Sequence, residues 1–197
     1  MRIAILIFDD VEVLDVMGPF EVFSVASRLR PAGSEEFTVS LVARNNSIVF
    51  ARGGLKLTPD ATFDSAAHYD LLIVPGGVTE RAEADAETIA WVTRQAEQSR
   101  VVASICTGAF LLAKACILTN QTVTTHWEDI GLLREAYPAL TVIEKVRWLQ
   151  SGENLYTSAG ISAGIDLSLH LVQTLTTREH AELTARQMDY RWVTNGH

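Results

Sequence analysis

The chain is poor in cysteine, with only Cys106 and Cys116 among its 197 residues. Two cysteines cannot build a disulfide framework, so the sequence predicts a protein of a reducing compartment, the cytoplasm. The chain also has no Cys-x-x-Cys pair and no cluster of histidines. These are the usual ligands of structural zinc, and their absence argues against such a site. No metal is predicted.

Positive charge is also scarce, with 16 Lys and Arg against 24 Asp and Glu and a net charge of −8. Nucleic-acid binding needs a basic face, so no nucleic acid is expected as a partner. No run of 18 apolar residues free of charge occurs, which predicts that no segment spans a membrane. The apolar start of the chain leads into acids rather than a cleavage site, which favours a strand over a signal peptide.

The sequence does contain a regular alternation of continuous apolar segments with segments of helical spacing. Strands are predicted at 2–8, 37–43, 70–77, 101–105, 121–127 and within 140–159, and helices at 18–29, 84–98, 107–118, 128–137, 164–176 and 178–191. Pro19 would stand in the first turn of its helix, and residues 51–63 would form a small hairpin or surface excursion. The alternation predicts one α/β domain over residues 1–197, with a mostly parallel central sheet and helices on both faces.

Cys106 follows the apolar strand at 101–105, with Ser104 and Gly108 two residues away on either side. A nucleophile elbow uses this spacing, because its sharp turn brings the strand and helix backbones close. A helix N-terminus there would favour the thiolate of Cys106. The alternative is a buried structural cysteine. Cys116, among aliphatic neighbours, is predicted to lie in the core.

Other residues with possible chemistry also follow predicted strands, and ligands of open α/β sheets bind at the carboxyl ends of strands. Gly76 and Gly77 could present backbone N–H groups to a developing negative charge, or could form a plain turn. His126 and its neighbour Trp127 could line a pocket or could be packing residues. Ala159 begins a small-residue loop after the strand that ends the 140–159 segment.

The first loop is rich in acids, and two of them compete for the role of general acid and base. Asp15 lies between Leu14 and Val16, and apolar surroundings would raise its proton affinity. Glu21 lies three residues after Gly18, where helix capping and the helix dipole explain an acid without any catalytic role. The chemistry alone leaves both open.

Six motifs together resemble the ThiJ/PfpI superfamily, which is related to class I glutamine amidotransferases. They are LDVMGPFEVF (14–23), PDATFD (59–64), DLLIVPGG (70–77), SICTGAFLLAKACIL (104–118), TVTTHW (122–127) and SAGISAGIDLSLHLV (158–172). Within the superfamily the chain is most similar to the branch of isonitrile hydratases and of the amidotransferase-like domains of AraC-type regulators. The resemblance covers nearly the whole chain and implies a flavodoxin-like three-layer α/β fold.

The resemblance implies roles for individual residues. It places the catalytic cysteine at Cys106, the catalytic threonine at Thr107 and the acid/base aspartate at Asp15, which decides between the two competing acids. The superfamily's glycine pair falls on Gly76 and Gly77. Protease-like members carry histidine directly after the cysteine, and because Thr107 stands there in this chain, peptidase activity is disfavoured.

The function implied is hydration of small organic isonitriles to N-substituted formamides, a lyase reaction that needs no cofactor. Other cysteine-dependent activities (amidase, glyoxalase or deglycase) and a ligand or redox sensor without turnover are the alternatives. The chain ends soon after the last predicted helix, so no helix-turn-helix module is expected. The superfamily also implies a homodimer, for which the apolar residues Phe20, Val22 and Phe23 would offer a face.

Overall fold

The computed structural model of the chain describes residues 1–31, 33, 35–64 and 68–194. The strands of its main sheet are Arg2–Leu6 (β1), Thr38–Ala43 (β2), Ala61–Thr62 (β5), Leu71–Val74 (β6), Val101–Ile105 (β7), Trp148–Gly152 (β10) and Leu155–Ser158 (β11). Their spatial order is β10-β11-β7-β6-β1-β2-β5, and every neighbouring pair is parallel except β10–β11. This is the mostly parallel sheet that the continuous apolar segments predict.

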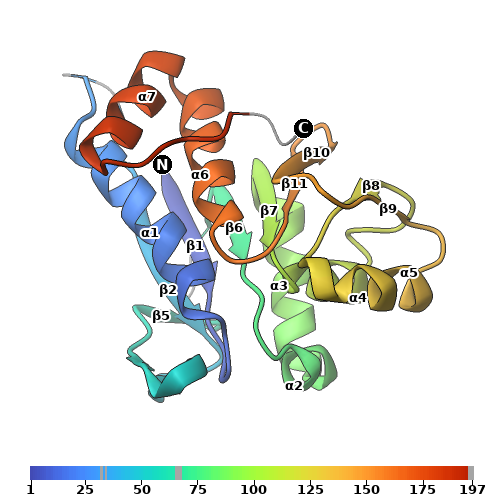
Figure 1. The fold of residues 1–197 in the computed structure, drawn as a ribbon. Coiled ribbons are helices and arrows are strands. Elements are labelled where there is room, and N and C mark those ends of the chain that lie inside the picture. The colour runs from blue at the N-terminus through green and yellow to red at the C-terminus, as the bar shows by residue number, and fades with distance from the viewer. Residues whose placement is uncertain (32, 34, 65–67, 195–197) are drawn as a thin grey trace.

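Helices cover both faces of the sheet (Figure 1). One layer consists of α1 (Val13–Arg28), α6 (Ala163–Leu175) and α7 (Arg178–Gln187), and the other of α2 (Glu80–Ala84), α3 (Ala86–Gln98), α4 (Gly108–Lys114) and α5 (Ile130–Ala136). Because side chains alternate across a strand, the sheet divides the apolar interior into two clusters. Ile3 and Ile5 of β1 pack under α1 and α6, whereas Ala4 and Leu6 pack under α3 and α4. The flavodoxin-like three-layer fold is confirmed.

Two small sheets accompany the main one. The antiparallel pair β3 (Val49–Phe50) and β4 (Lys56–Leu57), joined by the 3₁₀ turn Arg52–Gly54, forms a hairpin. The range predicted for it, 51–63, is wrong at both ends, because the hairpin begins at Val49 and residues 61–62 belong to β5 of the main sheet. The parallel pair β8 (Thr122–Val123) and β9 (Thr141–Val142) lies outside the main sheet. Among the described residues, no helix is long and apolar enough to span a bilayer.

Several predicted boundaries are wrong. The first helix begins at Val13, and Pro19 lies inside it. Proline at that position cannot donate a hydrogen bond to the carbonyl of Asp15, four residues earlier. The helix nevertheless continues, because its apolar face from Val16 to Ala26 is buried in the core.

The predicted strand at 121–127 shrinks to two residues because Thr124 and Thr125 turn away from it. The backbone N–H of Thr124 donates to the hydroxyl of Thr157 over 3.0 Å, and the hydroxyl of Thr125 donates to the carbonyl of Cys106 over 2.8 Å. The predicted helix at 107–118 ends at Lys114, since Cys116 adopts a left-handed φ of 58°. Cys116 is exposed, so its assignment to the core is wrong.

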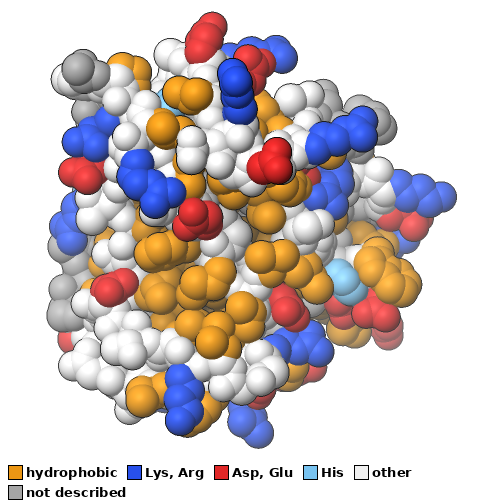
Figure 2. All heavy atoms as spheres, turned by 60° about the vertical axis from the view of Figure 1, so that its left-hand side comes forward, with side chains coloured by type: hydrophobic (Ala, Val, Ile, Leu, Met, Phe, Trp, Pro, Cys, Tyr) orange, Lys and Arg blue, Asp and Glu red, His pale blue; other side chains and the backbone are white. Residues whose placement is uncertain are grey.

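The residues proposed for a dimer face do not all reach the surface. Val22 and Phe23 are fully buried, and Phe20 is half-buried against the core. Apolar side chains do gather on the side of the molecule that α1 occupies (Figure 2), where Leu14 is 38% exposed. The homodimer stays a prediction.

Candidate active site

Cys106 lies between the end of β7 and the start of α4, as the elbow pattern predicts. Its φ is 55°, in the left-handed region that residues with a side chain rarely adopt. Such strain is found mainly at functional sites, where the surrounding structure enforces it. Here the backbone N–H of Cys106 is held by the carbonyls of Ser158 and Ala159, at 3.2 and 3.3 Å.

The residues around Cys106 are small because larger side chains would clash with neighbouring backbone atoms. A Cβ at Gly108 would lie 2.0 Å from the carbonyl oxygen of Val74, and one at Gly76 would lie 2.5 Å from the backbone nitrogen of Thr107. The turn after β6 therefore packs directly against the turn after β7. This close approach of two backbones is what the spacing in the sequence predicts.

Asp15 reaches this turn from α1 and is completely buried. One carboxylate oxygen accepts a hydrogen bond from the backbone N–H of Gly76 over 2.9 Å, while the other has no partner in the described chain. Burial raises the pKa of Asp15 from 3.8 to about 7, and the hydrogen bond from Gly76 and the neighbouring Cys106 side chain oppose the rise. Glu21, by contrast, is half-exposed and pairs with Arg28 at 3.5 Å. The geometry thus favours Asp15 over Glu21.

The thiol of Cys106 is also buried, with 6% of the residue exposed. Burial raises its pKa to about 12, and the neighbouring charge of Asp15 adds to the rise. Sequence reasoning expected the helix N-terminus to favour the thiolate, and burial beside an acid outweighs that effect. The resting pair is therefore a thiol beside a carboxyl group that is half-ionised near neutral pH.

The glycine pair does not offer its N–H groups to a substrate. The N–H of Gly76 is used by Asp15, and the N–H of Gly77 donates to the hydroxyl of Thr107 over 2.8 Å. The same hydroxyl donates back to the carbonyl of Gly77 over 2.9 Å. Both glycines hold Asp15 and Thr107 in place, and the expectation that they stabilise developing charge directly is wrong.

The donors near the sulfur are other backbone groups. Hydrogen bonds from the backbone N–H of Thr107 and of Ile161 lower the pKa of Cys106, against the larger effect of burial. Ile161 has a left-handed φ of 41°. Sequence reasoning missed it, because only a strained backbone aims its N–H at the sulfur, and the sequence shows no more than a small-residue loop after a strand.

A cavity of about 500 Å³ opens over Cys106. Its walls contain apolar residues, carboxylates, one guanidinium and one imidazole: Glu12, Arg52, Gly77, Val78, Thr79, Glu80, Glu83, Cys106, Thr107, Phe110, His126, Glu128, Asp129, Leu132, Ala136, Tyr137 and Ile161. Asp15 is absent from the walls and lies behind the sulfur. A molecule in the cavity can therefore contact the thiol of Cys106 directly. It can contact the carboxyl group of Asp15 only through the atoms that it places beside the sulfur.

His126 lines the cavity, and its Nδ1 lies 3.3 Å from a carboxylate oxygen of Asp129. Trp127 is 75% exposed and does not line the cavity, so its predicted role as a pocket residue is wrong. Ala159 does not line it either, and it acts through its carbonyl, which holds the N–H of Cys106. Within the described ranges, no group of three or more His, Cys, Asp or Glu side chains could hold a metal ion.

Gly160 packs so tightly on His126 that a Cβ there would lie 1.9 Å from the imidazole ring. The change Gly160→Ala is expected to displace the ring and lower the free energy of unfolding by about 2 kcal/mol. Thermal unfolding measures the loss. Gly131→Ala is the matched control, because nothing lies within 4 Å of its added Cβ. Equal melting temperatures for the two variants would contradict the close contact.

Comparison with known proteins shows the family of the chain. A model of the DJ-1/PfpI family matches residues 1–174. The chain belongs to the DJ-1/PfpI family. A DJ-1/PfpI relative, isonitrile hydratase from Pseudomonas putida, is 35% identical over 96% of this chain and 78% of its own length.

Other relatives of this chain are longer than it is. The transcriptional regulator GbdR of Pseudomonas aeruginosa is 29% identical, and this chain spans 52% of its length. A crystal structure of a ThiJ/PfpI family protein from Pseudomonas syringae has a TM-score of 0.84 at 28% identity, covering 96% of this chain and 74% of that one. Proteins similar to this chain therefore have quite different names, and the activity depends on the residues of the site.

Proposed function

We propose that the protein is an enzyme that hydrates small organic isonitriles to N-substituted formamides, with Cys106 as nucleophile and Asp15 as acid and base. The observation that carries the proposal is the buried pair itself: a strained thiol that opens on a cavity, beside a carboxyl group whose pKa is raised to about 7. The similarity to isonitrile hydratase supports the choice of reaction.

In the first step the sulfur of Cys106 forms a bond to the terminal carbon of the isonitrile. Asp15, ionised at the start, takes the thiol proton and delivers it to that carbon, which becomes a C–H group. The product is a thioimidate, R–N=CH–S–Cys106. Charge that develops during the attack lies near the backbone N–H groups of Thr107 and Ile161.

In the second step water adds to the carbon of the thioimidate. Asp15, ionised again, accepts one proton from the water and passes it to the nitrogen of the substrate, which gives the tetrahedral species R–NH–CH(OH)–S–Cys106. Asp15 then takes the hydroxyl proton as the C–S bond breaks and the formamide R–NH–CHO leaves, and it returns that proton to the sulfur. One isonitrile and one water give one formamide, so the cycle needs neither a redox partner nor a cofactor.

The walls of the cavity favour an uncharged, small substrate. Phe110, Leu132 and Tyr137 supply apolar surface, while Glu83 and four other carboxylates face one guanidinium, that of Arg52. Arg52 is itself paired with Glu12 at 3.2 Å. This excess of negative charge opposes an anionic small molecule, and with the net charge of −8 it also opposes a nucleic acid as partner.

The enzyme should therefore turn over isonitriles of similar size but different charge with different values of kcat/KM. We expect kcat/KM for an isocyanoacetate anion to be about tenfold below that for its uncharged methyl ester in low salt, with the gap shrinking as salt screens the carboxylates. Steady-state kinetics at two ionic strengths measure it. The variant Glu83→Gln should narrow the gap, and Glu153→Gln, which is exposed and outside the cavity, should not. Equal rates for acid and ester would contradict the charge argument.

Incubation of the purified protein with cyclohexyl isonitrile tests the reaction itself. We expect loss of the isonitrile infrared band and appearance of N-cyclohexylformamide by mass spectrometry. Methylglyoxal and a simple amide belong in the same panel. Turnover of one of them with the isonitrile untouched would replace the proposal by a deglycase or amidase activity, and no turnover at all would favour a sensor.

A further inference from the structure

The loop 159–162, between β11 and α6, lies beside Cys106. The carbonyl of Ala159 accepts the N–H of Cys106, and Ile161 lines the cavity beside Cys106. Gly160 packs against His126. The position of this loop therefore sets the surroundings of the reacting sulfur.

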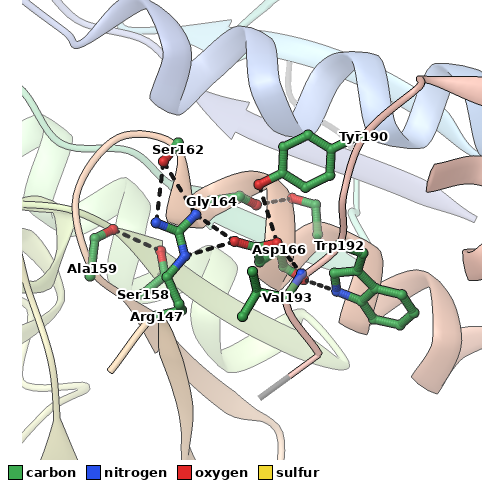
Figure 3. A network of polar contacts seen from close by, with 10 residues as sticks. Arg147, Ser158, Ala159, Ser162, Gly164, Asp166, Tyr190, Trp192 and Val193 are labelled. Atoms are coloured by element: carbon green, nitrogen blue, oxygen red, sulfur yellow. Dashed lines mark hydrogen bonds and ion pairs between the residues drawn. The ribbon is translucent and has the colours of Figure 1, made fainter. Parts of the chain in front are cut away.

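The loop is held by an ion pair that the site described above does not include. Arg147 precedes β10, and its Nε donates to a carboxylate oxygen of Asp166 over 2.8 Å (Figure 3). Its two terminal nitrogens, Nη1 and Nη2, each donate to the hydroxyl of Ser162 over 3.2 Å. The backbone carbonyl of Arg147 also accepts the N–H of Ala159 over 2.8 Å. Both ends of the loop are thus tied to one residue.

Asp166 is completely buried in the first turn of α6 and is satisfied on its other side by the C-terminal segment. Its second oxygen accepts hydrogen bonds from the hydroxyl of Tyr190 and the backbone N–H of Val193, at 3.2 and 2.9 Å. Trp192 donates to its backbone carbonyl over 3.1 Å (Figure 3). A buried carboxylate with this many donors has one fixed position, and it fixes Arg147 in turn.

We propose that Arg147 is a positioning residue for the reaction of Cys106: its fork to Asp166 and Ser162 holds the loop 159–162 so that the backbone N–H of Ile161 meets the charge forming at the sulfur. Arg147 itself does not line the cavity and touches no substrate. The inference rests on Cys106 being the reacting group, and it holds for any reaction of that thiol, including those other than isonitrile hydration.

Alkylation of Cys106 by iodoacetamide across pH tests this without any substrate. The protein carries Cys116→Ala, so that Cys106 is its one thiol. We expect Arg147→Gln to raise the pKa of Cys106 and to slow alkylation about tenfold at each pH below that pKa, because the thiolate loses a hydrogen bond from Ile161. Arg147→Lys keeps the charge and one contact to Asp166, and an intermediate rate is expected.

Arg134→Gln is the matched control. Arg134 is also a half-exposed guanidinium, and it donates to the carbonyl of Val142 over 3.1 Å, away from the loop. We expect its alkylation profile to stay within twofold of the parent. If folded Arg147→Gln reacts like the parent at every pH and only melts earlier, the role is purely structural and the proposal is overturned. If Arg147→Gln does not fold, the double variant Arg147→Lys, Ser162→Ala is used in its place. Slower alkylation of its Cys106 would support the proposal, and the parent rate at every pH would overturn it.

Discussion

Replacing Cys106 by alanine is expected to reduce isonitrile hydration by a factor of about 10⁴ or more, to the level of the uncatalysed reaction. In the proposed cycle the only covalent bond between enzyme and substrate is the C–S bond, and no neighbouring group can replace the sulfur. Rates of formamide formation with equal amounts of folded wild type and variant measure the effect. Any residual rate reports what the cavity achieves by binding alone.

The second cysteine supplies the control for this experiment. Cys116 is exposed and lies beyond the end of α4, and it does not line the cavity. Cys116→Ala should therefore keep the full rate. Hydration by Cys106→Ala at the wild-type rate would remove the sulfur from the mechanism, and with it the proposed function.

Replacing Asp15 by asparagine is expected to lower kcat/KM by about 10³, since general acid–base catalysis contributes between 10² and 10⁴. The amide oxygen can still accept the hydrogen bond from Gly76, so the turn keeps its geometry, but the amide cannot move a proton. The wild-type rate should rise with pH through about 7, where Asp15 loses its proton. That rise should vanish in the variant.

The same substitution is expected to make the protein more stable in alkali. The pKa of Asp15 is raised in the folded state, from 3.8 to about 7, so the folded protein holds this proton more tightly than the unfolded chain. Its contribution to stability is therefore full at low pH and is lost as pH rises toward 7. Above pH 7 the asparagine variant avoids a buried charge and should gain about 2 kcal/mol.

Denaturant unfolding at pH 5 and pH 8 measures this gain, which should be small at the lower pH. If Asp15→Asn is inactive but more stable than the wild type at pH 8, its loss of activity is not caused by unfolding. An asparagine variant as active as the wild type would show that Asp15 only supports the turn.

The layers of the fold could be predicted because each strand and each helix is marked by a pattern in its own stretch of sequence. Each buried parallel strand is a short apolar run, and each helix repeats its apolar residues at its own period. The boundaries that failed depend on tertiary contacts. The strand after Gln121 is cut short by hydrogen bonds of Thr124 and Thr125 to residues that are distant in sequence, and α1 extends past Pro19 because its face is buried.

The chemistry-bearing residues of the candidate site were also accessible from the sequence. Cys106 and Gly108 are marked by spacing. The apolar neighbours of Asp15 made it a candidate beside Glu21, and only the family resemblance chose between them. The sequence could not show which acceptor each backbone N–H group of the site binds. Gly76 and Gly77 have N–H groups free in principle, and only the structure shows that Asp15 and Thr107 occupy them. The ionisation of Cys106 was misjudged for the same reason, since burial is a property of the assembled fold.

The candidate site at the carboxyl edge of the sheet takes residues from both helical layers. Asp15 belongs to α1 on one side and Thr107 caps α4 on the other, while Ile161 precedes α6 on the first side again. An intermediate in which one layer has docked and the other has not would contain half of the candidate site, and the proposed reaction predicts that it is inactive. Recovery of activity during refolding should therefore follow the slower of the two docking events. It should lag behind the return of the helical circular dichroism signal, because only molecules with both layers docked are active.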